Sequence, residues 1–400
     1  MTVDSELPAP PVRREGPMDP PSAFRRLRAE APISRFRWPN GIEAWLVTRF
    51  DDVRAILNDP RVSVNRFASR PPSLSIGRKG GVMLPKSLSG MDPPEHTPRR
   101  ALYVRELTVR RVQRLQPRIT EIVDGLLDGM ERSGSPVDLV EAFAAPIPSM
   151  VICELLGVPQ EDQSEFQHHT NTIMGVDTPA DQVQTATLTL MDYLRGLIRM
   201  RRSDPGDDIL SRLTHGEIDG ATMDEDELVG HAMLLLIAGH ETTANMIALG
   251  ALTLLEHSDQ IAALTADPKR ADNMVEELLR YHTVVQYGLV RKVTADLPIG
   301  DVVIREGDWV VCSLASANRD ESVCPHSDTF DTGRENPRQV SFGYGSHQCA
   351  GQNLARLELK TALVRLFQRF PGLRVERPLE ELPFRTDAWV YGMQELLVRW

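Results

Sequence analysis

The chain has 400 residues, 41% of them hydrophobic and 25% charged, and its formal net charge is −11 at pH 7. This content can build a large core, and length alone would predict two or three domains. The acidic balance argues against a nucleic-acid partner. Four cysteines without paired spacing fit a reducing cytoplasm.

The first 21 residues are rich in proline and charge, which predicts a loosely ordered arm (1–21) ahead of the folded chain (22–400). No signal-peptide pattern or spanning helix is seen before the fold. We therefore expect a cytoplasmic protein that binds no membrane, and we also expect it to be a monomer.

The segment from Met91 to Arg100 contains two prolines followed by Glu95, a typical entry to a helix. His96 and Arg100 are four residues apart and share one helix face. Seven arginines and one carboxylate follow between Arg99 and Arg118. Such a run is usually a solvated helix face.

A long helix is predicted from a capping box at Thr222–Glu225 to about His257. At about 1.5 Å per residue it would be on the order of 50 Å long. A membrane span is rejected, because the apolar run 232–238 is far shorter than the roughly 20 residues required.

Glu241 and Thr242 stand side by side in the apolar centre of this helix, where polar groups cost stability unless they are paired or hydrated. One explanation is structural: Thr242 bonds back to the carbonyl one turn earlier, and Glu241 pairs with a surface arginine. The other explanation is catalytic.

A further helix is predicted to begin near Ala271, and it places Glu277 and Arg280 on one face. Beyond it, residues 284–312 alternate as strands do.

Cys349 lies in a glycine-rich loop, in which Gly343, Gly345 and Gly351 predict a sharp turn open to close approach. Residues 352–370 then have the spacing of an amphipathic helix. The start of a helix favours a thiolate, which is a metal ligand or a nucleophile. Cys153, Cys312 and Cys324 are expected to have no function.

The pattern Phe-x-x-Gly-x-x-x-Cys-x-Gly, filled by Phe342, Gly345, Cys349 and Gly351, resembles the haem-ligand loop of the cytochromes P450. The three segments around His96, Glu241 and Glu277 occur in that family's order. The resemblance is to soluble, actinobacterial-type members. It implies a mainly α fold with a small β-rich region, arranged as one triangular domain.

The resemblance also implies a site for haem b, with Cys349 as the axial thiolate and metal ligand. Glu241 and Thr242 match an acid–alcohol pair that relays protons to dioxygen. Glu277 and Arg280 match a structural ion pair that contacts a later arginine, either Arg334 or Arg338. Gly239 is expected to loosen the helix beside the iron. The other implied haem-site residues are His96, Arg100, Arg291 and His347 at the propionates, with Phe342, Gly345, Gly351, Ala238 and Gly239.

The resemblance further implies a monooxygenase that inserts one oxygen atom from O2 into its substrate, with electrons from NAD(P)H through ferredoxin reductase and ferredoxin. By the same resemblance, the ferredoxin would dock on some of Arg105, Arg110, Arg111 and Arg114. Apolar walls predict a lipophilic substrate. The likeness to actinobacterial members of the family implies a natural product such as a polyketide, macrolide, terpenoid or sterol-like compound. The implied pocket residues are Phe67, Val82, Met83, Leu84, Ile173, Met174, Leu234, Val284, Val285, Val390 and Tyr391.

Three alternatives remain beside the monooxygenase. A peroxygenase or isomerase of the same fold would keep the thiolate without a proton relay, and a haem-binding sensor would turn over nothing. A haem-free cysteine enzyme would need a base, for which His347 is the local candidate.

Overall fold

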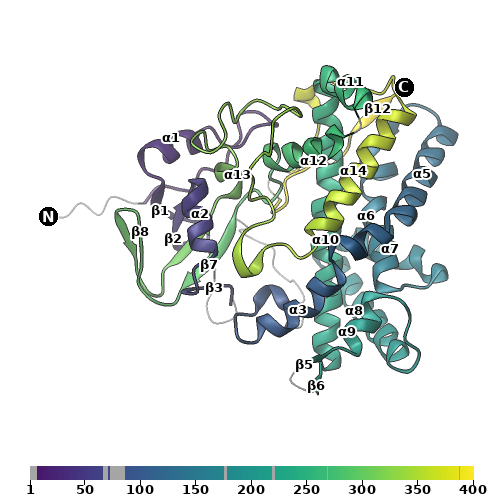
Figure 1. Ribbon diagram of the computed structural model, residues 1–400, viewed down its shortest axis with the longest axis horizontal. Helices are drawn as coiled ribbons and strands as arrows, with labels where there is room; N and C mark the ends of the chain where they lie inside the picture. The colour runs from purple at the N-terminus through teal and green to yellow at the C-terminus, as the bar shows by residue number, and fades with distance from the viewer. Residues whose placement is uncertain are drawn as a thin grey trace. The chain divides into compact units, whose positions relative to one another are not determined.

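The computed structural model describes residues 7–65, 71–72, 86–174, 178–218, 221–267, 269–386 and 388–400. The chain folds into two compact units (Figure 1). The first comprises residues 1–78 and 276–349, and the second comprises 79–275 and 350–400. The division into an arm and a single domain, 22–400, remains a prediction.

The first unit combines short helices with the larger sheet. Its elements are α1 (Ala23–Glu30), β1 (Ile33–Arg37), β2 (Glu43–Val47), α2 (Phe50–Leu57), β3 (Val62–Ser63), β7 (Leu289–Val293), β8 (Leu297–Ile299), β9 (Val302–Ile304), β10 (Trp309–Cys312), α13 (Leu314–Ala317) and the 3-10 turn η4 (Gly345–His347). Strands β7 to β10 all lie within the predicted strand region.

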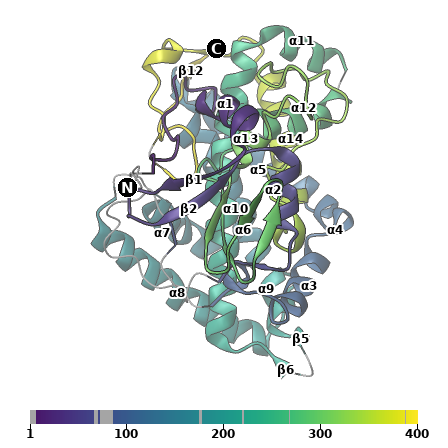
Figure 2. The ribbon, with the colours of Figure 1, turned by 90° about the vertical axis from the view of Figure 1, so that its left-hand side faces the viewer.

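The sheet of the first unit has the strand order β1-β2-β10-β7-β3. Only β2 and β10 run parallel; the other pairs are antiparallel. Figure 2 shows β1 and β2 side by side, with α2 beside them. All four residues of β10 are buried because it is the central strand, and Val310 packs in one core with Val47 and Phe50.

The second unit is mainly helical. Its elements are η1 (Leu88–Gly90), α3 (His96–Glu106), α4 (Val109–Arg114), α5 (Gln116–Ser133), β4 (Val137–Asp138), the π-helix η2 (Val140–Ala144), α6 (Pro146–Leu156), η3 (Gln160–Asp162), α7 (Gln163–Met174), α8 (Ala180–Ser203), α9 (Ile209–Thr214), β5 (Glu217–Ile218), β6 (Ala221–Thr222), α10 (Glu225–Glu256), α11 (Ser258–Ala266), α14 (Gln352–Arg369), β11 (Arg374–Val375), η5 (Leu379–Glu381) and β12 (Leu397–Arg399). Helix α12 (Arg270–Tyr281) spans the boundary between the units.

Helix α10 forms the core of the second unit and packs against α6, α8 and α14 (Figure 1). The predicted capping box is wrong: Thr222 belongs to β6, and Asp224 caps the helix by accepting the Glu227 N–H at 2.7 Å. By length and composition α10 could cross a membrane, contrary to the sequence argument. However, 61% of its apolar window is buried inside the structure, as in the core helix of a soluble protein.

The described part of the N-terminal segment makes specific contacts. Residues 7–21 contain no helix or strand. The Arg37 N–H donates to the carbonyl of Pro8 at 2.9 Å, and Asp19 pairs with Arg319 at 3.2 Å.

The prediction of a mainly α fold with small sheets is confirmed.

Candidate active site

The cysteine loop, residues 342–351, turns at two glycines. Gly343 and Gly345 have φ values of +70° and +74°, which other residues rarely adopt. Cys349 closes the turn, because its backbone N–H donates to the Phe342 carbonyl at 2.8 Å. Gly351 has an ordinary φ of −82° as the N-cap of α14, so the sharp turn depends on the first two glycines. The Cys349 side chain is exposed.

Close packing holds the loop against α2. A Cβ at Gly345 would stand 2.5 Å from the carbonyl oxygen of Leu57. Arg54 of α2 donates to the Tyr344 hydroxyl at 2.8 Å, and its guanidinium lies over the Tyr344 ring at 4.4 Å. The thiol is therefore presented from a rigidly supported turn.

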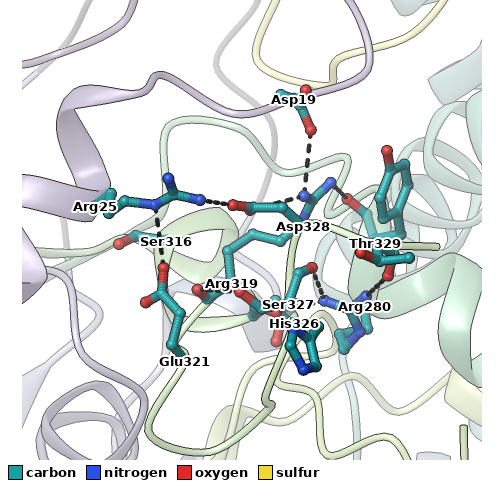
Figure 3. Close-up of polar contacts among 12 residues, drawn as sticks. Asp19, Arg25, Arg280, Ser316, Arg319, Glu321, His326, Ser327, Asp328 and Thr329 are labelled. Carbon is teal, nitrogen blue, oxygen red and sulfur yellow. Dashed lines mark hydrogen bonds and ion pairs between the residues drawn. The ribbon is translucent and has the colours of Figure 1, made fainter. Parts of the chain in front are cut away.

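The predicted Glu277–Arg280 ion pair is fully buried. Arg280 donates to both Glu277 oxygens at 2.7 Å. It also donates to the carbonyls of Ser327 and Thr329 (Figure 3). Of the two candidate arginines, Arg334 contacts Glu277, at 3.3 Å. The pair thus fixes the segment that leads to the cysteine loop.

Arg338 lies elsewhere, with its guanidinium over the Phe50 ring at 5.0 Å and 3.9 Å from Asp51. A second buried arginine, Arg319, pairs with Asp19 and Asp328 (Figure 3). Sequence reasoning missed this residue, since its partners are scattered along the chain.

The four predicted propionate ligands divide between the units. In the first unit, Arg291 is buried on β7 and donates to the Val290 carbonyl at 2.9 Å, while His347 ends η4. In the second unit, His96 and Arg100 lie on α3, and His96 is almost fully buried. Burial, and then the nearby Arg100, lowers the pKa of His96, so that its neutral form is favoured.

The centre of α10 has an open strip. Leu234, Ala238 and Thr242, spaced four residues apart, are exposed or half-buried where most of the helix is buried. The helix is regular α through Gly239, so the expected loosening is not seen. A Cβ at Gly239 would meet Ile152 of α6 at 3.0 Å, which gives the glycine a packing reason.

The structural explanation for Glu241 and Thr242 is met in part. The Thr242 hydroxyl donates to the Ala238 carbonyl at 2.8 Å. Arg385 donates to a Glu241 carboxylate oxygen at 2.5 Å. The partner is not a surface arginine, because only 12% of the Arg385 side chain is exposed. Sequence reasoning missed Arg385.

The neighbouring His240 is a packing residue. Its side chain is buried, and burial lowers its pKa to about 4. Glu358 on α14 is buried as well, and its Oε2 has no hydrogen-bond partner among the described residues. Burial raises the pKa of Glu358 to about 8.

The predicted pocket residues have varied surroundings. Phe67, Val82, Met83 and Leu84 lie outside the described residues. Ile173, Met174, Leu234 and Val285 are half-buried, whereas Val284, Val390 and Tyr391 are buried. Tyr391 stacks on Phe384 with ring centroids 5.9 Å apart.

The arginine run on α3 to α5 is only partly paired. Arg99 pairs with Glu227, Arg111 with Glu106, and Arg118 with Glu121 and Glu154. Within the described ranges, Arg105, Arg110 and Arg114 are exposed without an ion pair. Val104 and Val109, which directly precede Arg105 and Arg110, are 46% and 61% exposed.

The side chains of Cys349 and of the predicted propionate ligands suit a haem group. An exposed thiol in a supported turn could be an iron ligand, and arginine and histidine side chains suit carboxylates. The small Ala238 side chain on the open strip would admit a flat ring system. The thiol of Cys349 belongs to the first unit, and Ala238 belongs to the second.

Residues 13–387 match the protein family described as Cytochrome P450. Pentalenic acid synthase of Streptomyces avermitilis is 44% identical over 390 residues, covering 98% of this chain and 96% of that protein. A solved structure of CYP105P1 in complex with filipin I is 42% identical, with a TM-score of 0.91 and 99% of both chains covered.

A third similar protein is the mycinamicin VIII C21 methyl hydroxylase MycCI of Micromonospora griseorubida, solved with mycinamicin VIII bound. It is 38% identical, with a TM-score of 0.89, and the match covers 98% of this chain and 100% of that one.

Proposed function

Because the chain belongs to the cytochrome P450 family and is one of its monooxygenases, we propose that it inserts one oxygen atom from O2 into a lipophilic natural product. The second oxygen atom leaves as water, and two electrons from NAD(P)H balance the reaction. The presentation of Cys349 by its turned loop is the observation that best supports this proposal.

In this proposal Cys349 is the axial ligand of haem b, with Phe342, Gly345 and Gly351 beside it. The haem would supply the oxidising chemistry, because a thiolate ligand favours O–O cleavage. Arg100, Arg291, His96 and His347 would hold its propionates.

The first test is the visible spectrum of the reduced protein under carbon monoxide. We expect the red-shifted Soret band of a thiolate ligand, lost in Cys349→Ser and kept in Cys324→Ala. Cys324 is a suitable control because it is a buried cysteine of the same unit. A colourless wild-type protein would overturn the assignment and favour a haem-free cysteine enzyme.

Glu241 and Thr242 are proposed to deliver protons during turnover. Thr242 lies on the open strip of α10 and the half-buried Glu241 is its neighbour, so that this acid and hydroxyl would hold water between them. We expect Thr242→Ala to divert electrons from product to hydrogen peroxide. If peroxide alone supported turnover at the same rate in Thr242→Ala and the wild type, the peroxygenase would be favoured.

We propose a macrolide, polyketide or terpenoid as substrate. The names of the similar proteins support this, since one hydroxylates mycinamicin VIII and another was solved with filipin I. A panel of such compounds can be screened by the shift in the resting haem spectrum. If polar metabolites alone shifted it, the lipophilic assignment would fail.

We propose that a ferredoxin docks on the exposed arginines of α3 and α4, in a cytoplasmic, monomeric enzyme. Exposed Val104 and Val109 would supply apolar contact inside a ring of positive charge, which steers an acidic partner. The rate of reduction should fall with salt and in Arg105→Glu, Arg110→Glu and Arg114→Glu. Arg26→Glu, an exposed arginine of the first unit, is the control. Equal rates in all variants would refute this docking site.

A further inference from the structure

Glu241 is held by an arginine from the C-terminal segment. Arg385 Nη2 lies 2.5 Å from Glu241 Oε1, and the side chains are only 12% and 21% exposed. A charge pair so shielded from water resists screening by salt. Removing one partner would leave the other charge partly buried and uncompensated.

The same segment is fastened to α10 a second time, one turn further on. The Asn245 side-chain amide donates to the Glu241 carbonyl at 2.8 Å, and its oxygen accepts the Met393 N–H at 3.2 Å. Between these two contacts the segment folds back on itself, because the Arg385 N–H donates to the Gly392 carbonyl at 2.8 Å. We call the described residues 384–386 and 388–393 the C-terminal loop.

Gly392 makes this close approach possible. A Cβ at position 392 would collide with the Asn245 side chain. The loop thus lies directly on the helix turn that carries Glu241 and Asn245, and the carboxylate contacts the loop through Arg385. Any displacement of the loop therefore moves the counter-charge of the acid.

We propose that Arg385 is the positioning residue for Glu241 and that the C-terminal loop thereby sets when the acid passes its proton; this rests on the function proposed above. Arg385 fixes one carboxylate oxygen, and the Thr242 hydroxyl is occupied by the Ala238 carbonyl. To act, the Glu241 carboxylate takes a proton from solvent water and passes it to water beside Thr242. The resulting carboxylate pairs again with Arg385.

The test compares Arg385→Gln, Arg385→Lys and Arg377→Gln with the wild type. Arg377 is a matched control, since it lies in the same C-terminal region and pairs with Glu395 in an exposed ion pair. Two quantities are measured in turnover: product formed per NAD(P)H consumed, and the solvent isotope effect on kcat. Hydrogen exchange of the amides of residues 384–393 is measured without substrate.

In Arg385→Gln we expect product per NAD(P)H to fall roughly tenfold, with KM nearly unchanged. The loss is smaller than the roughly 10²–10⁴-fold contribution of a general acid–base group, because Glu241 itself is kept. The solvent isotope effect should rise, and exchange in the loop should speed up. Arg385→Lys should restore part of each quantity because it keeps the positive charge. Arg377→Gln should match the wild type.

Two results would overturn the proposal. If Arg385→Gln kept the wild-type product ratio and isotope effect, Arg385 would not position the acid, whatever the loop did. If Arg385→Lys were as impaired as Arg385→Gln in all three quantities, the charge would not be the reason. A wild type that inserted no oxygen would instead refute the proposed function, and the exchange data would still report on the ion pair.

Discussion

Glu358 should make the stability of this protein fall as pH rises. Its carboxyl is buried on α14, and burial alone raises its pKa from the usual 4.5 to about 8. Between pH 4.5 and about 8, Glu358 therefore keeps its proton in the folded chain, whereas the unfolded chain releases it. Stability then decreases with pH across this window, by about 1.4 kcal/mol per pKa unit and roughly 5 kcal/mol in total.

The substitution Glu358→Gln keeps the shape and removes the proton. Urea denaturation of both proteins, followed by fluorescence from pH 5 to 8.5, gives the difference in free energy of unfolding. We expect the advantage of the variant to grow by several kcal/mol over this range. A difference that stayed constant with pH would refute the reasoning, because it would mean that Glu358 titrates alike in both states.

Three further predictions follow from the same structure. Glu277→Gln should cost about 3–5 kcal/mol in urea denaturation, since it leaves Arg280 buried without its counter-charge; an unchanged midpoint would contradict this. Gly345→Ala should lower thermal stability and haem retention, because φ is +74° and the added Cβ would stand 2.5 Å from the carbonyl oxygen of Leu57. Haem retention equal to that of the wild type would show that the loop adapts. The wild-type protein should lose stability as pH falls from 6.5 to 4, because burial lowers the pKa of His240 to about 4 and the histidine then binds a proton only on unfolding. His240→Gln should make this loss smaller. If the free energy of unfolding fell equally with pH in both proteins, His240 would be excluded as the cause.

The parts of the fold and site that sequence could predict are local. The turn at Gly343 and Gly345, the helix that begins at Gln352 and the Glu277–Arg280 pair each depend on residues close together in the chain. Backbone angles, helical spacing and apolar periodicity act over such distances, and all three features were confirmed.

The features that sequence missed join distant segments. Arg385 and Glu241 are 144 positions apart, and nothing in the residues around either one indicates the other. The choice between Arg334 and Arg338 depended on the path of the chain, since Arg334 also donates to the carbonyls of Pro325 and His326. Even the cap of α10 was decided by tertiary structure, because pairing of β6 with β5 takes Thr222 away from the helix.

The close approach at Gly392 has a consequence for laboratory evolution. Trp389, three positions earlier in the same loop, is 44% exposed. At position 392 every side chain would meet Asn245, so randomised libraries should return glycine there almost invariably. Random substitutions at this end of the chain should therefore include Trp389 and leave Gly392 unchanged.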